Sequence, residues 1–227
     1  MAAPTTGTLP YLLLLLTVVA GAVDAVSFLS LGHVFVVNMT GNIVFLGFAA
    51  AGVTEISLTA TLVALGTFLC GSVVGGRLAL RFADERLLTV ATIVKIVLVA
   101  IALIVVATSR ESLDTLQRYA VIALLAFAMG VQNASARRIG IPDLTTTVLT
   151  MTLTALAADS SLAGGTNPRW SRRALSIGSM LLGAFAGGLC VLHQGIAAAL
   201  VLVLVLLAIT GLLARFAFRA PANGADV

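Results

Sequence analysis

Charged residues are scarce in this chain, and their scarcity decides its class. Only 10% of the 227 residues are Asp, Glu, Lys or Arg, whereas a soluble domain carries about 25%. The sequence is 60% hydrophobic and its mean hydropathy is +1.14, so a soluble fold could not keep its apolar surface out of water. These proportions exclude a water-soluble domain and indicate an integral membrane protein.

Cysteine, histidine and catalytic motifs are also sparse or absent. Cys70 and Cys190 lie singly within apolar runs, and His33 and His193 lie in predicted connections without metal-ligand spacing. The chain has no phosphate-binding Gly-rich loop with a Lys, no dinucleotide fingerprint, no H-E-x-x-H and no G-x-S-x-G. We therefore expect no disulfide, no metal, no cofactor and no enzymatic activity.

A basic surface for nucleic acid is missing as well. The net charge of +4 comes from Arg residues that stand singly or in pairs at the ends of apolar runs. Loops beside anionic lipid headgroups have this pattern. The expected partners are the lipid bilayer and a small solute of unknown identity, not nucleic acid, and a homo-oligomer is left open.

Eight apolar segments fill the chain, each close to the roughly 20 residues that a helix needs to cross the hydrocarbon. The first has no Lys or Arg before it and is long enough to span, so we expect a retained first helix rather than a cleaved signal peptide. We expect one membrane domain over residues 1–227, with a disordered tail at 221–227. The segments lie at about 9–31, 34–52, 57–80, 88–107, 118–137, 143–162, 174–192 and 196–216.

The sequence also predicts an internal repeat. A shift of 112 residues places Asn38-Met39-Thr40 on Thr150-Met151-Thr152. The same shift aligns four pairs of glycines, and a shift of 109 places Gly21 and Asp24 on Gly130 and Asn133. We therefore expect two repeats of four segments, at about 9–107 and 118–216. We expect the paired glycines to pack the third segment closely against the seventh. The pairs join Gly66, Gly71, Gly75 and Gly76 to Gly178, Gly183, Gly187 and Gly188 respectively.

Arginine positions choose between two topologies. If all eight segments cross the membrane, the Arg residues divide about evenly between its two sides. If the second and sixth segments instead enter and return on one side, nearly all Arg residues share one side, and only Arg110 and Arg118 oppose them. Cytoplasmic loops retain basic residues. We therefore favour an all-α bundle of two inverted repeats, with about six full crossings, two broken or re-entrant polar segments and cytoplasmic termini; eight full spans is the alternative.

Polar residues inside apolar segments are the candidate site, since lipid cannot satisfy them. Asp24 is either a proton or cation site or a structural hydrogen-bonding group. Asn38, Thr40 and Asn42 either line a break in the second segment near 39–41 or join packed helices. Their counterparts in the second repeat are Gln132, Asn133, Thr147, Thr150 and Thr154. These residues form either a binding stripe lined by hydroxyls and amides or groups that bond within their own helices.

Lys95 is the sole lysine and lies inside the fourth segment. Its long side chain is expected to extend toward the Arg86 end of that segment, where its ammonium group reaches water. The alternative is that Lys95 pairs with Asp24 or recognises an anion.

Two blocks of the chain resemble a known family. The stretches GAVDAVSFLSLGHVFVVNMTGNIVFLG (21–47) and AMGVQNASARRIGIPDLTTTVLTMTLTALAAD (128–159) resemble the signature blocks of the bacterial YoaK-like membrane proteins, the domain of unknown function 1275. The resemblance covers about residues 10–216. It implies a multi-pass inner-membrane protein with about six spans, a suspected transport role and no established substrate.

Taken together, the residues predict a small-solute transporter or channel of the inner membrane. The solute is expected to bind between the 38–42 break and the 147–154 stripe, with proton coupling at Asp24. The alternative is a non-transporting sensor or assembly protein whose polar clusters only pack helices together.

Overall fold

The fold is all-helical over the residues that the computed structural model describes, which are 7–109, 112–141 and 149–217. No strand is present in these ranges. One short 3-10 helix, η1, lies at Ser161–Ala163. The helices are α1 (Leu9–Ser30), α2 (Met39–Ala50), α3 (Leu58–Arg81), α4 (Asp84–Thr108), α5 (Thr115–Ile139), α6 (Leu149–Ala158), α7 (Trp170–Gln194) and α8 (Ile196–Ala217).

Helix length separates spans from shorter elements. Helices α1, α3, α4, α5, α7 and α8 have 21 to 25 apolar-rich residues over their candidate spans, long enough to cross a membrane. Helix α2 has 12 residues and α6 has 10, which correspond to about 18 Å and 15 Å against a hydrocarbon core of about 30 Å. The protein is thus a multi-pass helical membrane protein with six candidate spans, and the eight-span alternative is not supported.

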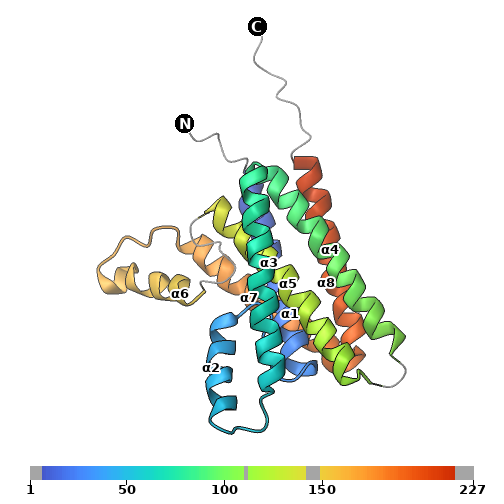
Figure 1. Cartoon of the computed structure of the whole chain (residues 1–227). Coiled ribbons are helices and arrows are strands. Elements are labelled where there is room, and N and C mark those ends of the chain that lie inside the picture. The colour runs from blue at the N-terminus through green and yellow to red at the C-terminus, as the bar shows by residue number, and fades with distance from the viewer. Residues whose placement is uncertain (1–6, 110–111, 142–148, 218–227) are drawn as a thin grey trace.

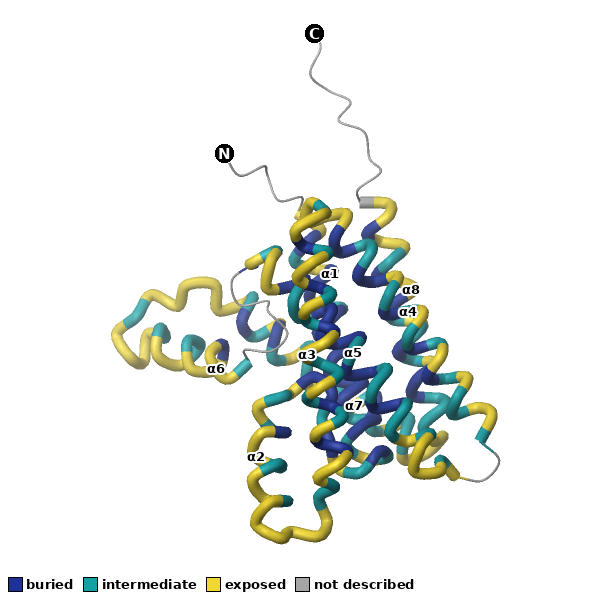
Figure 2. The backbone as a smooth tube through the Cα atoms, viewed as in Figure 1, coloured by how far each residue is buried: buried dark blue, intermediate teal, exposed yellow. Residues whose placement is uncertain are grey.

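Helices α1 and α5 form the centre of the bundle. Most of their residues are buried, whereas α3, α4, α7 and α8 keep large exposed apolar faces and α2 and α6 lie at the periphery (Figure 2). Helix α1 packs on α7 and α8, and α5 packs on α3 and α4. The exposed apolar side chains of the outer helices are typical of surfaces that face lipid.

Glycines allow the closest crossings. Where α3 meets α5, a Cβ on Gly71 would clash with the Phe127 carbonyl oxygen, and a Cβ on Gly130 would clash with that of Phe68. Where α1 meets α7, a Cβ on Gly183 would clash with the Val18 carbonyl oxygen, and a Cβ on Gly21 with that of Met180. Small residues let two backbones approach in this way. The two crossings involve residues that the sequence shift had paired.

The prediction that the glycines of α3 pack against those of α7 was wrong. Helices α3 and α7 do not touch each other; each packs on a central helix from the other repeat. Gly75 and Gly187 lie at these crossings, where an added Cβ would be 2.8 Å from the carbonyl oxygens of Val131 and Ala22 respectively. Gly66, Gly76 and Gly178 face open space, and Gly188 has only Leu29 nearby. Half of the predicted packing glycines are therefore not at close helix crossings.

The two ends of the bundle differ in charge. The start of α1 and the end of α8 lie at the same end, and successive long helices run in opposite directions (Figure 1). We call this the termini end. Among the described residues, Arg118 lies at the opposite end, close to the start of α5. Those at the termini end are Arg77, Arg81, Arg86, Arg137, Arg138, Arg169, Arg172, Arg173 and Arg215.

Candidate functional site

Asp24 holds the non-helical segment between α1 and α2. After α1 ends, Gly32 and His33 adopt positive φ angles of 103° and 55°, and the chain turns back toward the bundle. The buried Asp24 carboxylate then accepts backbone hydrogen bonds from Val36 and Val37 at Oδ1, at 3.0 and 2.8 Å, and from Asn38 at Oδ2, at 3.2 Å. A single carboxylate therefore satisfies three backbone donors that lipid could not.

Asn42 holds the other side of the same segment. Its side-chain Oδ1 accepts from the Phe35 N–H at 2.9 Å and its Nδ2 donates to the Phe35 carbonyl at 2.6 Å. The Phe35 ring stacks on those of Phe28 and Phe45, with centroids 5.1 and 5.5 Å away, and the three rings form one cluster. Helix α2 starts at Met39, so the break lies before the helix rather than at 39–41 as expected. Asn42 bonds the backbone of Phe35 and lines neither of the cavities described below.

A cavity of about 910 Å³ lies beside the start of α2. It collects polar side chains from three elements: Asn38 and Thr40 next to the break, Ser72 on α3 and Asn133 on α5. Arg137 and Arg138 also line it. Its apolar and small lining residues are Val37, Met39, Phe68, Gly76, Ala79, Leu80, Ala134 and Ala136. Three of the predicted site residues, Asn38, Thr40 and Asn133, therefore share one cavity.

A second cavity of about 320 Å³ lies on the other side of the same segment, between α1 and α7. Asp24 and Asn38 are its polar lining residues, and Asn38 thus contributes to both cavities. The remaining lining residues are Gly21, Ala25, Phe28, Leu29, Phe35, Met180 and Ala184.

Lys95 lies at the middle of α4 and is fully buried. Its Nζ donates to Gln132 Oε1 at 2.8 Å, and Gln132 Nε2 donates to the Leu16 carbonyl at 3.2 Å, so the contact joins α4, α5 and α1. The expectation that Lys95 reaches toward Arg86 and water is therefore wrong. Lys95 bonds Gln132 and not Asp24, and it lines neither cavity.

The second polar element does not join the first. Thr147 lies outside the described residues. Thr150 and Thr154 are exposed on α6, and Thr154 donates to the Thr150 carbonyl within its own helix at 2.9 Å. Helices α2 and α6 make no contact, and no threonine of α6 lines either cavity. The expected site between 38–42 and 147–154 is therefore not formed among the described residues.

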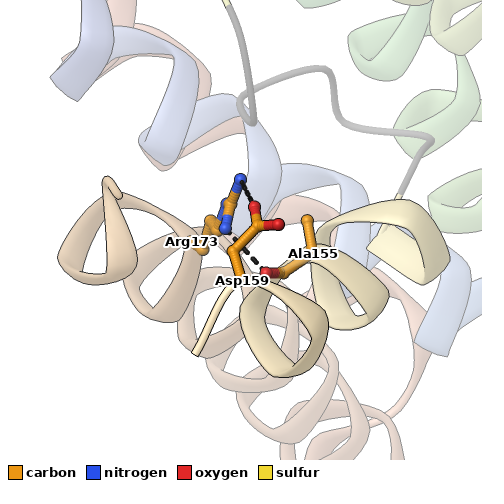
Figure 3. Close-up of polar contacts among 3 residues, drawn as sticks. All are labelled: Ala155, Asp159 and Arg173. Carbon is orange, nitrogen blue, oxygen red and sulfur yellow. Dashed lines mark hydrogen bonds and ion pairs between the residues drawn. The ribbon is translucent and has the colours of Figure 1, made fainter. Parts of the chain in front are cut away.

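Helix α6 is tied to α7 instead. The buried Arg173 donates from Nη1 to the Ala155 carbonyl at 2.7 Å, and its Nη2 lies 2.8 Å from Asp159 Oδ2 (Figure 3). Since Asp159 is partly exposed and its partner is not, this ion pair mainly orders the end of α6 against the start of α7.

The arrangement offers hydrogen-bonding groups to a small polar molecule. Amide and hydroxyl side chains face the larger cavity, and two guanidinium groups line it as well. No group of three or more His, Cys, Asp or Glu among the described residues could hold a metal. Ser72, Arg137 and Arg138 line the larger cavity but were not predicted as site residues. Ser72 lies one helical turn before Gly76 on α3, so a search along that helix face would have found it.

Comparisons with known proteins agree with the predicted resemblance. The profile of the family described as protein of unknown function, DUF1275, matches residues 12–213. The chain is 38% identical to the UPF0700 transmembrane protein YoaK of Bacillus subtilis strain 168 over 150 residues. That alignment covers 66% of this chain and 66% of the relative, slightly less than two thirds of each. No solved structure matches the chain.

Proposed function

Because this chain belongs to DUF1275, a family whose description assigns no activity, we propose a function from the site itself. The protein moves a small polar solute across the inner membrane of the cell. The solute enters the larger cavity beside the start of α2 and passes the segment that Asp24 and Asn42 hold in place.

The observation that carries this proposal is the meeting of the two repeats in one cavity. Asn38 and Thr40 come from the first repeat and Asn133 comes from the second. Polar groups are costly inside a membrane unless they serve packing or a pathway. These three line open space rather than only a helix contact, and the 910 Å³ of that space exceeds the needs of a few water molecules.

The proposal includes an inverted arrangement of the repeats with cytoplasmic termini. Three spans in each repeat make corresponding helices run in opposite directions, as in many secondary transporters. The concentration of Arg residues at the termini end supports a cytoplasmic location for that end.

Asp24 is proposed as the coupling group. Its charge stabilises three hydrogen bonds from the segment that separates the two cavities. Protonation of the carboxylate would weaken these bonds, because hydrogen bonds to a charged acceptor are about twice as strong as neutral ones. Proton binding would thereby loosen the segment while solute passes.

A blocked cavity tests the proposal. Gly76 lines the larger cavity and an added Cβ there meets nothing within 4 Å, so Gly76→Phe adds a bulky ring at the cavity wall without a clash at its Cβ. Gly66→Phe is the matched control, since Gly66 also faces open space on α3 but does not line the cavity. Proteoliposomes containing each protein are mixed with glycerol, urea, glycine or acetate, and solute entry is followed by light scattering.

We expect the native chain to admit at least one of these solutes faster than protein-free liposomes. Gly76→Phe should slow that entry by about tenfold or more, because the width of a pathway controls passage, and Gly66→Phe should not. Equal entry through both variants would contradict the proposal, as would entry no faster than through lipid alone for every solute.

One observation favours a second function, that of a non-transporting sensor or assembly protein. The side chains of Asp24 and Asn42 both bond the backbone of the same segment, as a purely structural role requires. On this function the cavities hold lipid chains, and Gly76→Phe and Gly66→Phe behave alike in every assay.

A further inference from the structure

The two cavities are built from corresponding positions of the two repeats. The 112-residue shift places Phe68 and Ser72 of the larger cavity on Met180 and Ala184 of the smaller one. The 109-residue shift places the α1 wall of the smaller cavity on the α5 wall of the larger one. These pairs are Asp24 with Asn133, Ala25 with Ala134, Phe28 with Arg137 and Leu29 with Arg138.

The cavities lie toward opposite ends of the bundle. The larger one extends along α3 to Leu80 and along α5 to Arg138, each next to the last residue of its helix at the termini end. The smaller one extends along α1 to Leu29, next to the last residue of a helix that ends at the other end. Figure 1 shows α1 and α3 running in opposite directions.

Only a short piece of chain lies between the cavities. Asn38 lines both, and its backbone N–H is bound by Asp24 from the side of the smaller cavity. We propose that the two cavities are the two mouths of one pathway and that the Asn38 side chain is the solute contact at its midpoint. This inference rests on the proposed function and adds to it a binding residue and a second entrance.

Unequal volumes identify the state of this pathway. The mouth at the termini end measures about 910 Å³ and the other about 320 Å³, although corresponding residues form both. In a transporter built from two inverted repeats, exchanging the conformations of the repeats exchanges the open and closed mouths. The structure is therefore the state open toward the termini end, and a second state opens the mouth that contains Asp24.

The lining restricts the solute to one chemical class. Asn38 is the residue that both mouths share, and its side-chain amide offers one acceptor and two donors without charge. The flanking groups differ between the mouths, with Arg137 and Arg138 at one and Phe28 and Leu29 at the other. A small polar molecule with both hydrogen-bond donors and acceptors fits the shared part, and it must pass through the smaller cavity.

Thiol accessibility tests the inference without measuring transport. In a full-length chain with Cys70→Ala and Cys190→Ala, single cysteines replace Asn38, Ser72, Ala184 or Gly66. A small charged methanethiosulfonate that does not cross membranes is added to right-side-out and to inside-out vesicles. Ser72→Cys and Ala184→Cys report the two mouths at corresponding positions, and Gly66→Cys, on the exposed face of α3, is the control.

We expect Ser72→Cys to react from the termini side and Ala184→Cys from the opposite side, with Gly66→Cys unreactive from both. Asn38→Cys should react from both sides. Since a minor state is typically populated at 0.1–10%, its reaction from the opposite side should be about 10- to 1000-fold slower than from the termini side. Adding Gly76→Phe should slow only the reaction from the termini side.

Each other outcome overturns the inference. Reaction of Asn38→Cys from one side alone, or reaction of Ser72→Cys and Ala184→Cys from the same side, would show separate cavities rather than two mouths. These results could coexist with solute entry in the liposome assay, so failure of the inference is distinguishable from failure of the proposed function. Conversely, two-sided reaction of Asn38→Cys without entry of any tested solute would support the two mouths and contradict the proposed function.

Discussion

At the residue scale, Asp24 acts through backbone rather than through another side chain. The sequence identified it because a carboxylate in an apolar helix is expensive and must be satisfied. Its partners, the N–H groups of Val36, Val37 and Asn38, could not be predicted. They depend on where the chain leaves helical geometry after α1 and on how it turns back at Gly32 and His33, which bring a segment 12 to 14 residues away onto the carboxylate.

Asp24→Asn separates coupling from folding. The substituted amide is neutral and carries an NH₂ group in place of one carboxylate oxygen, so all three backbone donors lose a charged acceptor and at least one of them loses its acceptor altogether. We expect a loss of about 1.5–3 kcal/mol in unfolding free energy, a folded protein in the membrane, and no proton entry driven by solute in liposomes that contain a pH-sensitive dye.

The control for this change is Asn42→Ala, which removes the bonds to Phe35 on the other side of the same segment. It should cost comparable stability but retain solute-driven proton entry. If Asn42→Ala abolishes proton entry as fully as Asp24→Asn does, the carboxylate has no special part in coupling.

Lys95 shows a different limit at this scale. Sequence position predicts that a lysine two turns inside a span reaches for the nearest interface. The acceptor that it uses, Gln132 Oε1, belongs to α5 and lies 37 residues away. The Lys95 ammonium group is bound by a side chain of another helix instead of by water. The residues next to Lys95 in the sequence do not indicate this contact.

At the element scale, the sequence predicted the helices better than their neighbours. Hydropathy located all six spans within a few residues. Glycine spacing located the contact faces of α3 and α7 only in part, at two of the four predicted glycines on each helix, and did not predict the helices on which they pack. A face of small residues shows that some backbone comes close; which helix supplies that backbone depends on how the two repeats are interleaved.

Alanine substitutions at corresponding glycines test these crossings. Gly71→Ala and Gly183→Ala place a methyl group against the carbonyls of Phe127 and Val18, and each should cost about 1–3 kcal/mol of unfolding free energy. Gly66→Ala and Gly178→Ala, where nothing lies within 4 Å, should stay within about 1 kcal/mol of the native chain, on the stabilising side. Denaturation in mixed detergent micelles measures all four, and equal effects in both pairs would refute the crossings.

At the scale of the whole molecule, charge distribution predicts orientation. The Arg residues gather at the end where α1 starts and α8 ends, and basic residues are retained on the cytoplasmic side. A fluorescent protein fused to the C-terminus should therefore fluoresce, since it folds in the cytoplasm. Ser112→Cys, between α4 and α5, should react with an impermeant thiol reagent added outside intact cells.

The opposite pattern would reverse the orientation without altering the fold. A dark fusion together with a Ser112→Cys that reacts only in inside-out vesicles would place the larger cavity on the outer side. The control is the chain with Cys70→Ala and Cys190→Ala, which should not react in either preparation.

The glycine crossings carry a consequence for the origin of the molecule. Each one joins a helix of the first repeat to a helix of the second, so a half-length chain has no surface of its own to complete them. On the proposed inverted arrangement, an ancestor of that length would have completed these contacts with a second copy in the opposite orientation in the same bilayer. Fusion of two such genes would then have fixed that antiparallel pairing in one chain.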